Sequence, residues 1–225
     1  MTQDLILIPD VSLIDNSEER LPVVLVLDCS GSMAGAKIDA LRVGIEVMNR
    51  EIKDDPKAAK SVRILVIQFC GDHEVSVGEW QDLMDFVPPN LQANGRTPTG
   101  AAMLRALDEI EKQKEQMRQA GISYKRPLLF LMSDGEPTDD WKRASELSQA
   151  AMTTNKVTVF PIGVGSDANL EILAKFSQKG AIRLDGLKFK ELFMWLSASV
   201  KTVSRTAQGQ NTQLPPIDSW ATVIS

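Results

Sequence analysis

Buried-strand and amphipathic-helix patterns alternate along most of this chain. Continuous apolar runs are typical of strands that are covered on both faces in a parallel sheet. Such runs predict strands at residues 21–27, 61–70, 128–132, 156–164 and 181–184. Residues 74–80 instead alternate apolar and polar side chains, which predicts an edge strand after a turn at Gly71-Asp72-His73.

Between the strands, apolar residues recur at the three- and four-residue spacing of helices that bury one face. This spacing predicts helices at residues 36–53, 100–119, 138–153, 169–178 and 189–202, and a shorter one within 81–91. Thr99 and Thr138 are the expected N-caps of the helices at 100–119 and 138–153, with Asp139 and Asp140 in the first turn of the latter. Strands alternating with helices predict an α/β fold: a doubly wound (Rossmann-like), mostly parallel, six-stranded sheet with one antiparallel edge strand and helices on both faces.

Changes in composition divide the chain into three parts. Residues 21–204 form the predicted domain. Residues 1–20 precede it as an N-terminal extension, in which the short apolar stretch Leu5–Ile8 predicts a strand, and we expect this extension to lie against the domain. Residues 205–225 are richer in polar residues and contain Pro215-Pro216, which is typical of a C-terminal tail.

Composition and charge narrow the classes of protein to which the chain can belong. Of its 225 residues, 43% are hydrophobic and 24% are charged, which is ordinary for a soluble globular protein. Its net charge of −5 and pI near 5.1 argue against a dedicated nucleic-acid-binding protein. The N-terminus lacks the positive segment of a signal peptide, and the longest apolar runs are far shorter than a membrane span. The two cysteines form no disulfide framework, so we expect a cytoplasmic protein with reduced thiols. The single histidine excludes a histidine-rich zinc site.

The residues that carry chemistry begin where the first buried strand ends. Asp28, Ser30 and Ser32 follow the apolar run 21–27 at a spacing of two residues, which points alternate side chains the same way in an extended segment. Gly31 allows a tight turn between the two serines. Open α/β folds bind ligands at the carboxyl edge of the sheet, and oxygen donors such as these suit a hard cation such as Mg²⁺.

This segment resembles the metal-ion-dependent adhesion site of von Willebrand factor type A domains, whose motif begins with Asp-x-Ser-x-Ser after a buried strand. Asn94 to Gly100 is similar to the threonine loop of that family, with Thr97 at the ligand position. Ser133-Asp134-Gly135-Glu136 is similar to its second aspartate segment, again after a buried strand. The resemblance spans residues 21–204, and the narrower similarity is to bacterial, tellurium-resistance-associated members of the family.

The resemblance implies a site in which hydroxyl groups bind a divalent cation directly and aspartates bind it directly or through water. The corresponding residues of this chain are Asp28, Ser30, Ser32, Thr97 and Asp134. Mg²⁺ is the expected cation, with Mn²⁺ and Ca²⁺ as alternatives. A cation with few negative ligands seeks one more anion, which in the family is a Glu or Asp carboxylate of a partner protein. The residues expected to line the rim and select this carboxylate are Glu136, Asp139 and Arg96.

The resemblance therefore implies a non-catalytic protein-interaction module, in a bacterial complex of the stress-response or tellurium-resistance type. Two alternatives stay open. The first is a Mg²⁺-dependent hydrolase of the phosphohydrolase type. Such an enzyme would need a second acid at the position that Ser30 occupies here. It would also need a nucleophile–base pair, and the sequence does not reveal one. The second is a structural α/β domain without a functional metal, in which Asp28 and Ser32 cap helices and Asp134 opens a turn.

Overall fold

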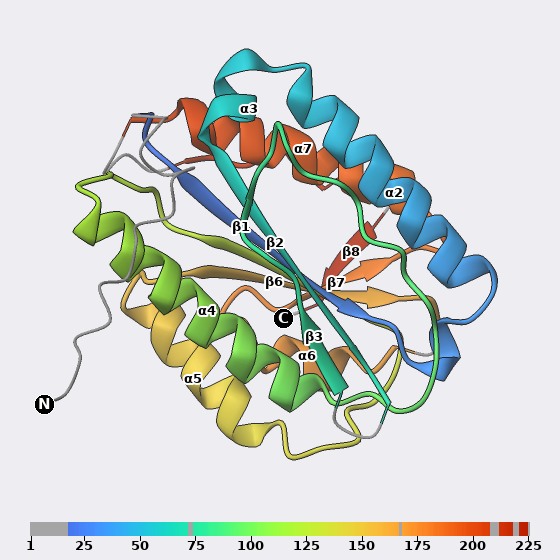
Figure 1. Ribbon diagram of the computed structural model, residues 1–225. Helices are drawn as coiled ribbons and strands as arrows, with labels where there is room; N and C mark the ends of the chain where they lie inside the picture. The colour runs from blue at the N-terminus through green and yellow to red at the C-terminus, as the bar shows by residue number, and fades with distance from the viewer. Residues whose placement is uncertain (1–17, 72–73, 167, 208–211, 218–220, 225) are drawn as a thin grey trace, which may run out of the picture.

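The computed structural model describes residues 18–71, 74–166, 168–207, 212–217 and 221–224 (Figure 1). The predicted strand at Leu5–Ile8, most of the predicted N-terminal extension and His73 lie outside these described residues.

Within the described residues, one sheet of eight strands has the order β3-β2-β1-β5-β6-β7-β8, with β4 also paired to β2. The parallel strands are β1 (Leu21–Asp28), β2 (Val62–Cys70), β5 (Leu128–Ser133), β6 (Thr158–Val164) and β7 (Ala181–Leu184). The strands that run antiparallel to their neighbours are β3 (Glu74–Val77), β4 (Gln81–Asp82) and β8 (Ala221–Ile224).

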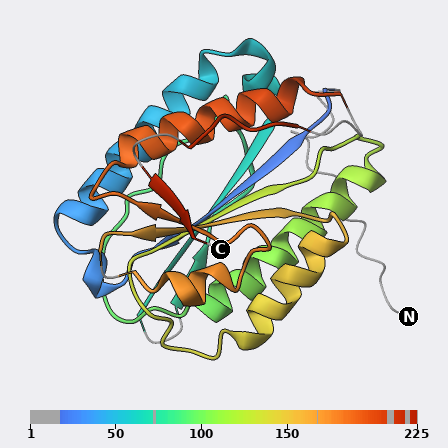
Figure 2. The ribbon, with the colours of Figure 1, turned by 180° about the vertical axis from the view of Figure 1, so that it is seen from behind.

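Helices cover both faces of this sheet (Figure 1, Figure 2). The helices packed on one face are α2 (Ala36–Lys53), α3 (Pro56–Ser61) and α7 (Phe189–Arg205). The helices packed on the other face are α4 (Thr99–Gln119), α5 (Lys142–Thr153) and α6 (Leu170–Ala174). A 3₁₀ turn, Gly31–Met33, joins β1 to α2. None of the helices in the described part of the chain is both long and apolar enough to cross a membrane.

β1 lies near the centre of the sheet, and its side chains alternate between the two halves of the core. Leu25 and Leu27 pack in the layer of α2 and α7. Val24 and Val26 pack in the layer of α4 and α5. Every residue of β1 is buried, which is why its sequence is an unbroken apolar run before Asp28.

The predicted fold class is confirmed, and all six predicted strands are present. The predicted number of strands is too small, because the sheet has eight. One additional strand is the two-residue β4. The other is β8, which forms within the segment predicted to be a tail and pairs antiparallel with β7, with Ala221 opposite Leu184. The sheet therefore has antiparallel strands at both edges.

The helix predicted within residues 81–91 is wrong, because this segment begins with β4 and continues without a helix. The carboxylate of Asp82 pairs with Arg20 at 3.1 Å and with Arg63 at 3.0 Å, and both arginines are fully buried. These contacts hold the segment extended against β2. Tertiary contacts of this kind override a local helical pattern.

The order of the strands creates a switch point beside β1. The chain leaves β1 toward β2 and β3 on one side, and it returns to β5 on the other side. The crossovers after β1 and β5 therefore lead to opposite sides of this point, and open α/β sheets bind ligands at the carboxyl edge beside such a switch point. Asp28 ends β1 and Asp134 follows β5, so the two aspartates come from adjacent central strands, as predicted.

Candidate metal centre

Three loops meet at the carboxyl edge of the sheet. The loop after β1 contacts the threonine loop, because Gly31 N donates to Gly95 O at 3.0 Å and Asn94 N donates to Cys29 O at 2.8 Å. The threonine loop contacts the segment after β5, because Thr138 N donates to the carbonyl oxygen of Thr97 at 3.0 Å. Backbone hydrogen bonds thus place segments that are distant in the sequence around one point.

Gly95 allows the threonine loop to pass very close to the loop after β2. Its φ of 62° lies in the left-handed region, where residues with a side chain are strained. A Cβ at this position would lie 2.3 Å from Gly71 Cα, which is a backbone atom that cannot rotate away. Only glycine fits here, and this packing brings Thr97 beside the loop after β1.

The side-chain oxygens of the predicted ligands converge between these loops. Ser30 Oγ lies 3.0 Å from Ser32 Oγ, and Ser32 Oγ donates a hydrogen bond to Asp134 Oδ1 at 2.7 Å. The hydroxyl oxygens of Ser32 and Thr97 lie equally far, 3.8 Å, from the point where a Cβ on Gly135 would stand. The structure therefore brings the side-chain oxygens of four of the five predicted ligands together beside Gly135.

The fifth predicted ligand, Asp28, lies beneath this group and is fully buried. Its Oδ1 accepts a hydrogen bond from Ser30 N at 2.8 Å, and its Oδ2 accepts one from Ser133 Oγ at 2.5 Å. Burial raises the pKa of this carboxyl above its ordinary value, the hydrogen bonds from Ser133 and Ser30 lower it in part, and the charge of Asp134 raises it further. Asp28 is therefore a buried acid held under the hydroxyl groups.

Lys37, near the start of α2, already places a positive charge at this point. Its ammonium group forms an ion pair with Asp134 Oδ2. The side chain of Asp134 is fully buried, whereas that of Lys37 is 24% exposed. A lysine in the first turn of a helix opposes the helix dipole, so the attraction to the carboxylate has to offset that cost.

The donor set suits a small, hard divalent cation. Hydroxyl and carboxylate oxygens are the ligands that Mg²⁺ and Ca²⁺ prefer in proteins. The hydrogen bonds that join Ser30, Ser32 and Asp134 place these oxygens within reach of one cation. Among the described residues, no group of three or more His, Cys, Asp and Glu side chains converges, so these donors differ from those of a zinc cluster.

The family model for the von Willebrand factor type A domain matches residues 23–191, a range that contains all five predicted ligands. The chain belongs to the von Willebrand factor type A domain family. Heavy chain H6 of inter-alpha-trypsin inhibitor from Homo sapiens is 22% identical over 197 residues, covering 80% of this chain and 15% of that protein. The chain spans between 15% and 19% of the length of the curated relatives that it matches.

Solved structures of other type A domains share the fold. The von Willebrand factor domain of the type V pili tip protein Mfa5 from Porphyromonas gingivalis has a TM-score of 0.56 at 13% identity, covering 86% of this chain and 99% of that one. Proximal thread matrix protein 1 from the mussel byssus, in a structure with a zinc-occupied metal-ion-dependent adhesion site, has a TM-score of 0.54 at 13% identity, covering 82% of this chain and 48% of that one. At these identities the likeness concerns the fold alone.

Two of the residues expected on the rim of the type A site are exposed. Glu136 accepts a hydrogen bond from Asn169 Nδ2 at 2.8 Å, which ties the segment after β5 to the start of α6. Arg96 is also exposed, next to Thr97 in the threonine loop.

Asp139, the third expected rim residue, caps a helix instead. Its two carboxylate oxygens accept hydrogen bonds from Gly100 N at 3.0 Å and Ala101 N at 2.8 Å, at the start of α4. The predicted N-cap role of Thr99 is therefore wrong, because Thr99 is already in the helix and a carboxylate from a distant segment takes the capping position. The predicted place of Asp139 in the first turn of the next helix is also wrong, because α5 begins only at Lys142.

Thr138 is not the N-cap of α5 either. Its hydroxyl oxygen accepts a hydrogen bond from Thr97 N at 3.1 Å and so supports the threonine loop. Sequence reasoning also missed Lys37 and Ser133 as members of the site. Lys37 had a usable signal, a lysine in a first helical turn directly after an oxygen-rich motif. Ser133 looked like the last residue of a buried strand, and only the pairing of β1 with β5 places it against Asp28.

Proposed function

We propose that this type A domain is a non-catalytic protein-interaction module that binds one divalent cation and captures a carboxylate of a partner protein. The observation that carries the proposal is the convergence of the Ser30, Ser32, Thr97 and Asp134 oxygens from three loops. Members of this family generally mediate protein–protein interactions. The metal-ion-dependent adhesion site of the mussel protein binds zinc, which supports metal binding at the equivalent edge of the sheet here.

In this proposal each ligand has a defined task. The hydroxyl groups of Ser30, Ser32 and Thr97 are neutral ligands, and Asp134 is the anionic ligand nearest to them. Asp28 supplies a second negative charge from below and orients Ser30 through its backbone N–H. When bound, the cation supplies a Lewis-acidic position for an incoming carboxylate. Glu136 and Arg96 then shape the approach of the partner, whereas Asp139 acts only through the position of α4.

The charge balance favours an additional anion. Two carboxylates, Asp28 and Asp134, face a divalent cation together with the ammonium group of Lys37. The site with its cation therefore keeps a net positive charge, and a glutamate or aspartate of the partner would neutralise it. Water-excluded charges attract strongly, so a carboxylate bound in this way would leave slowly.

The cation that we propose is Mg²⁺ in the cell, with Mn²⁺ and Ca²⁺ as weaker alternatives. We further propose a cytoplasmic location, to which the free thiols of Cys29 and Cys70 are suited. The proposed setting, a bacterial complex of the stress-response or tellurium-resistance type, comes from the resemblance of the sequence motifs.

Titration calorimetry with Mg²⁺ tests the metal site. Asp28→Asn removes one charge and keeps the shape of the side chain, so we expect Mg²⁺ binding to fall at least tenfold. Asp85→Asn is the matched control, because Asp85 is an exposed acid in the distant segment after β4. Equal affinity of wild type and Asp28→Asn would defeat the assignment of the site.

Binding of a partner is tested separately. Protein captured from cell extract in Mg²⁺ should be lost in EDTA and with Asp28→Asn, and kept with Asp85→Asn. A captured protein that remains in EDTA would contradict a metal-bridged interaction, even where the calorimetry shows metal binding.

A further inference from the structure

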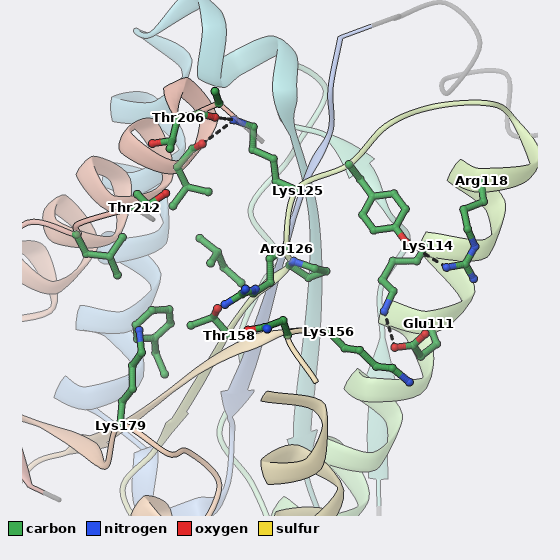
Figure 3. A pocket seen from close by; sticks show the side chains of 18 residues that line it. Glu111, Lys114, Arg118, Lys125, Arg126, Lys156, Thr158, Lys179, Thr206 and Thr212 are labelled. Carbon is green, nitrogen blue, oxygen red and sulfur yellow. Dashed lines mark hydrogen bonds and ion pairs between the residues drawn. The ribbon is translucent and has the colours of Figure 1, made fainter. Parts of the chain in front are cut away.

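A cavity of about 810 Å³ opens at the amino edge of the sheet, opposite the metal centre (Figure 3). Arg126 and Pro127 line it directly before β5, and Lys156 lines it shortly before β6. Its other walls come from the last turns of α4 and α7 and from Asn155 after α5. The volume lies within the range of sites that bind ligands.

The charge of this cavity is opposite to that of the chain. The whole chain has a net charge of −5. Among the side chains that line the cavity, one is acidic, Glu111, and six are basic: Lys114, Arg118, Lys125, Arg126, Lys156 and Lys179. Like charges gathered in a concave surface repel each other and raise the local concentration of anions.

Some of these basic side chains have structural partners. Lys125 is buried and donates hydrogen bonds to the carbonyl oxygens of Val203 at 2.8 Å and Ser204 at 3.0 Å, at the end of α7. Lys114 is only 5% exposed, and its ammonium group pairs with Glu111 at 2.6 Å. Stabilisation of the end of α7 and an ion pair within α4 therefore explain part of the cluster.

Arg126, Lys156 and Lys179 have no such explanation. All of them are exposed, and within the described residues no carboxylate lies within ion-pair distance of their charged groups. Lys179 instead stands over the ring of Phe160, with 5.7 Å between the ammonium nitrogen and the ring centre. Figure 3 shows that these side chains come to the cavity from different segments.

We infer that this basic cavity binds an acidic peptide segment of a partner protein, in which an apolar side chain lies between carboxylates. Apolar side chains of Leu128, Phe160, Val203 and Leu214 line the cavity and would receive the apolar side chain. The basic side chains around them would pair with the carboxylates. The surface is separate from the metal centre, so the inference goes beyond the proposed function.

The surroundings disfavour a compact anion such as phosphate. Phosphate sites in α/β folds use backbone N–H groups at helix N-termini. The ends of α4, α5 and α7 at this cavity are C-termini, which present carbonyl oxygens and a partial negative charge. Carboxylates spread along a peptide can reach the outer basic side chains without approaching those carbonyl groups.

Fluorescence anisotropy in EDTA tests this inference, because EDTA removes any contribution of the metal centre. The probe is a fluorescein-labelled peptide in which Glu alternates with Leu and Phe. The test variant is the double charge reversal Arg126→Glu with Lys156→Glu. The matched control is Lys142→Glu with Arg143→Glu, an equal charge change on exposed residues at the start of α5, toward the opposite edge of the sheet.

We expect wild type and the control to bind the peptide with similar affinity, and the test variant to bind at least tenfold more weakly. Affinity in wild type should fall as salt is raised, because the contacts are between charges. Absence of binding to wild type, or equal binding by both variants, would overturn the inference. ATP or inorganic phosphate that displaces the peptide at a lower concentration than the unlabelled peptide would overturn the choice of a peptide.

Discussion

Lys37 affects the two proposed steps of binding in opposite directions. In the metal-free protein its ammonium group compensates Asp134, and in the metal-bound protein it repels the cation. Lys37→Ala should therefore raise the affinity for Mg²⁺ by about tenfold, which corresponds to about 1.4 kcal/mol. The same change should weaken capture of a carboxylate, because the site loses its excess positive charge.

Calorimetry with Mg²⁺ and a pull-down in saturating Mg²⁺ measure these two effects of Lys37→Ala. Lys57→Ala, an exposed lysine at the start of α3, is the control and should leave both unchanged. A loss of Mg²⁺ affinity in Lys37→Ala would show that Lys37 positions Asp134 rather than opposing the cation.

The thiol of Cys29, next to the metal centre, is made unreactive by its surroundings. Burial raises the pKa of this thiol to about 12, and the charge of Asp28 contributes to the shift. At pH 8 the thiolate fraction is then on the order of 10⁻⁴, against roughly a quarter for a thiol with an ordinary pKa. Iodoacetamide should modify Cys29 at least 100-fold more slowly in the native protein than in urea at the same pH.

Mass spectrometry of the alkylated peptides separates Cys29 from Cys70, which is only partly buried and serves as the internal reference. Equal rates of modification of Cys29 in native and unfolded protein would contradict the burial that raises its pKa.

At the scale of the elements, α2 and α7 pack closely at Gly44. A Cβ at this position would lie 2.3 Å from Cδ2 of the Phe193 ring. Alanine normally improves a helix by about 1 kcal/mol over glycine. Overpacking a core costs about 1–3 kcal/mol, so Gly44→Ala should leave the protein less stable by up to about 2 kcal/mol.

Urea unfolding measures this change in the free energy of unfolding. Gly44→Ala should cost less stability when it is added to Phe193→Leu than when it is added to wild type, because the smaller leucine side chain makes room for the methyl group. Greater stability of Gly44→Ala than of wild type would mean that the two helices are free to separate.

Helix boundaries show where local patterns suffice for prediction. The predicted range 36–53 agrees with α2, because a regular apolar face and Pro56 define its extent. The caps around α4 and α5 were mispredicted, because Asp139 stabilises the start of a helix 39 residues earlier in the chain. A cap contributed from another segment leaves no signal near the helix that it caps.

At the scale of the whole molecule, the C-terminal segment completes the fold. β8 pairs with β7 and so forms the edge of the sheet, and Trp195 Nε1 donates to the carbonyl oxygen of Pro215 at 2.9 Å. Leu214 and Ile217 are partly buried against the core. A chain that ends at Ala207 should lose about 2 kcal/mol or more of unfolding free energy, because each of these apolar side chains contributes on the order of 1 kcal/mol when half buried.

The urea midpoint of that truncated chain should therefore be lower than that of the full chain. Val223→Thr is the control, because Val223 is 49% exposed and keeps its backbone pairing with Ile182. An unchanged midpoint in the truncated chain would show that the segment lies on the domain without stabilising it.

The sequence alone determined the fold class and the identity of the converging oxygen donors. Strands buried on both faces must be continuous apolar runs, and strands of a doubly wound sheet deliver their last residues to one edge, so the pattern of the chain is enough to place Asp28 and Asp134 together. The fold class and the placing of Asp28 and Asp134 rest on local pattern and on the few topologies that such patterns permit. The complete set of donors, including Thr97, came from the resemblance of the motifs to the type A family.

Only the tertiary structure decided which neighbours these residues have. The ion pair of Lys37 with Asp134, the hydrogen bond of Ser133 to Asp28, the cap from Asp139 and the pairing of β8 all join segments far apart in the sequence. The basic cavity likewise gathers charges from α4 and from the segments that precede β5, β6 and β7, although the chain as a whole is acidic. Such contacts depend on how helices and strands pack in three dimensions, which neither residue spacing nor composition specifies.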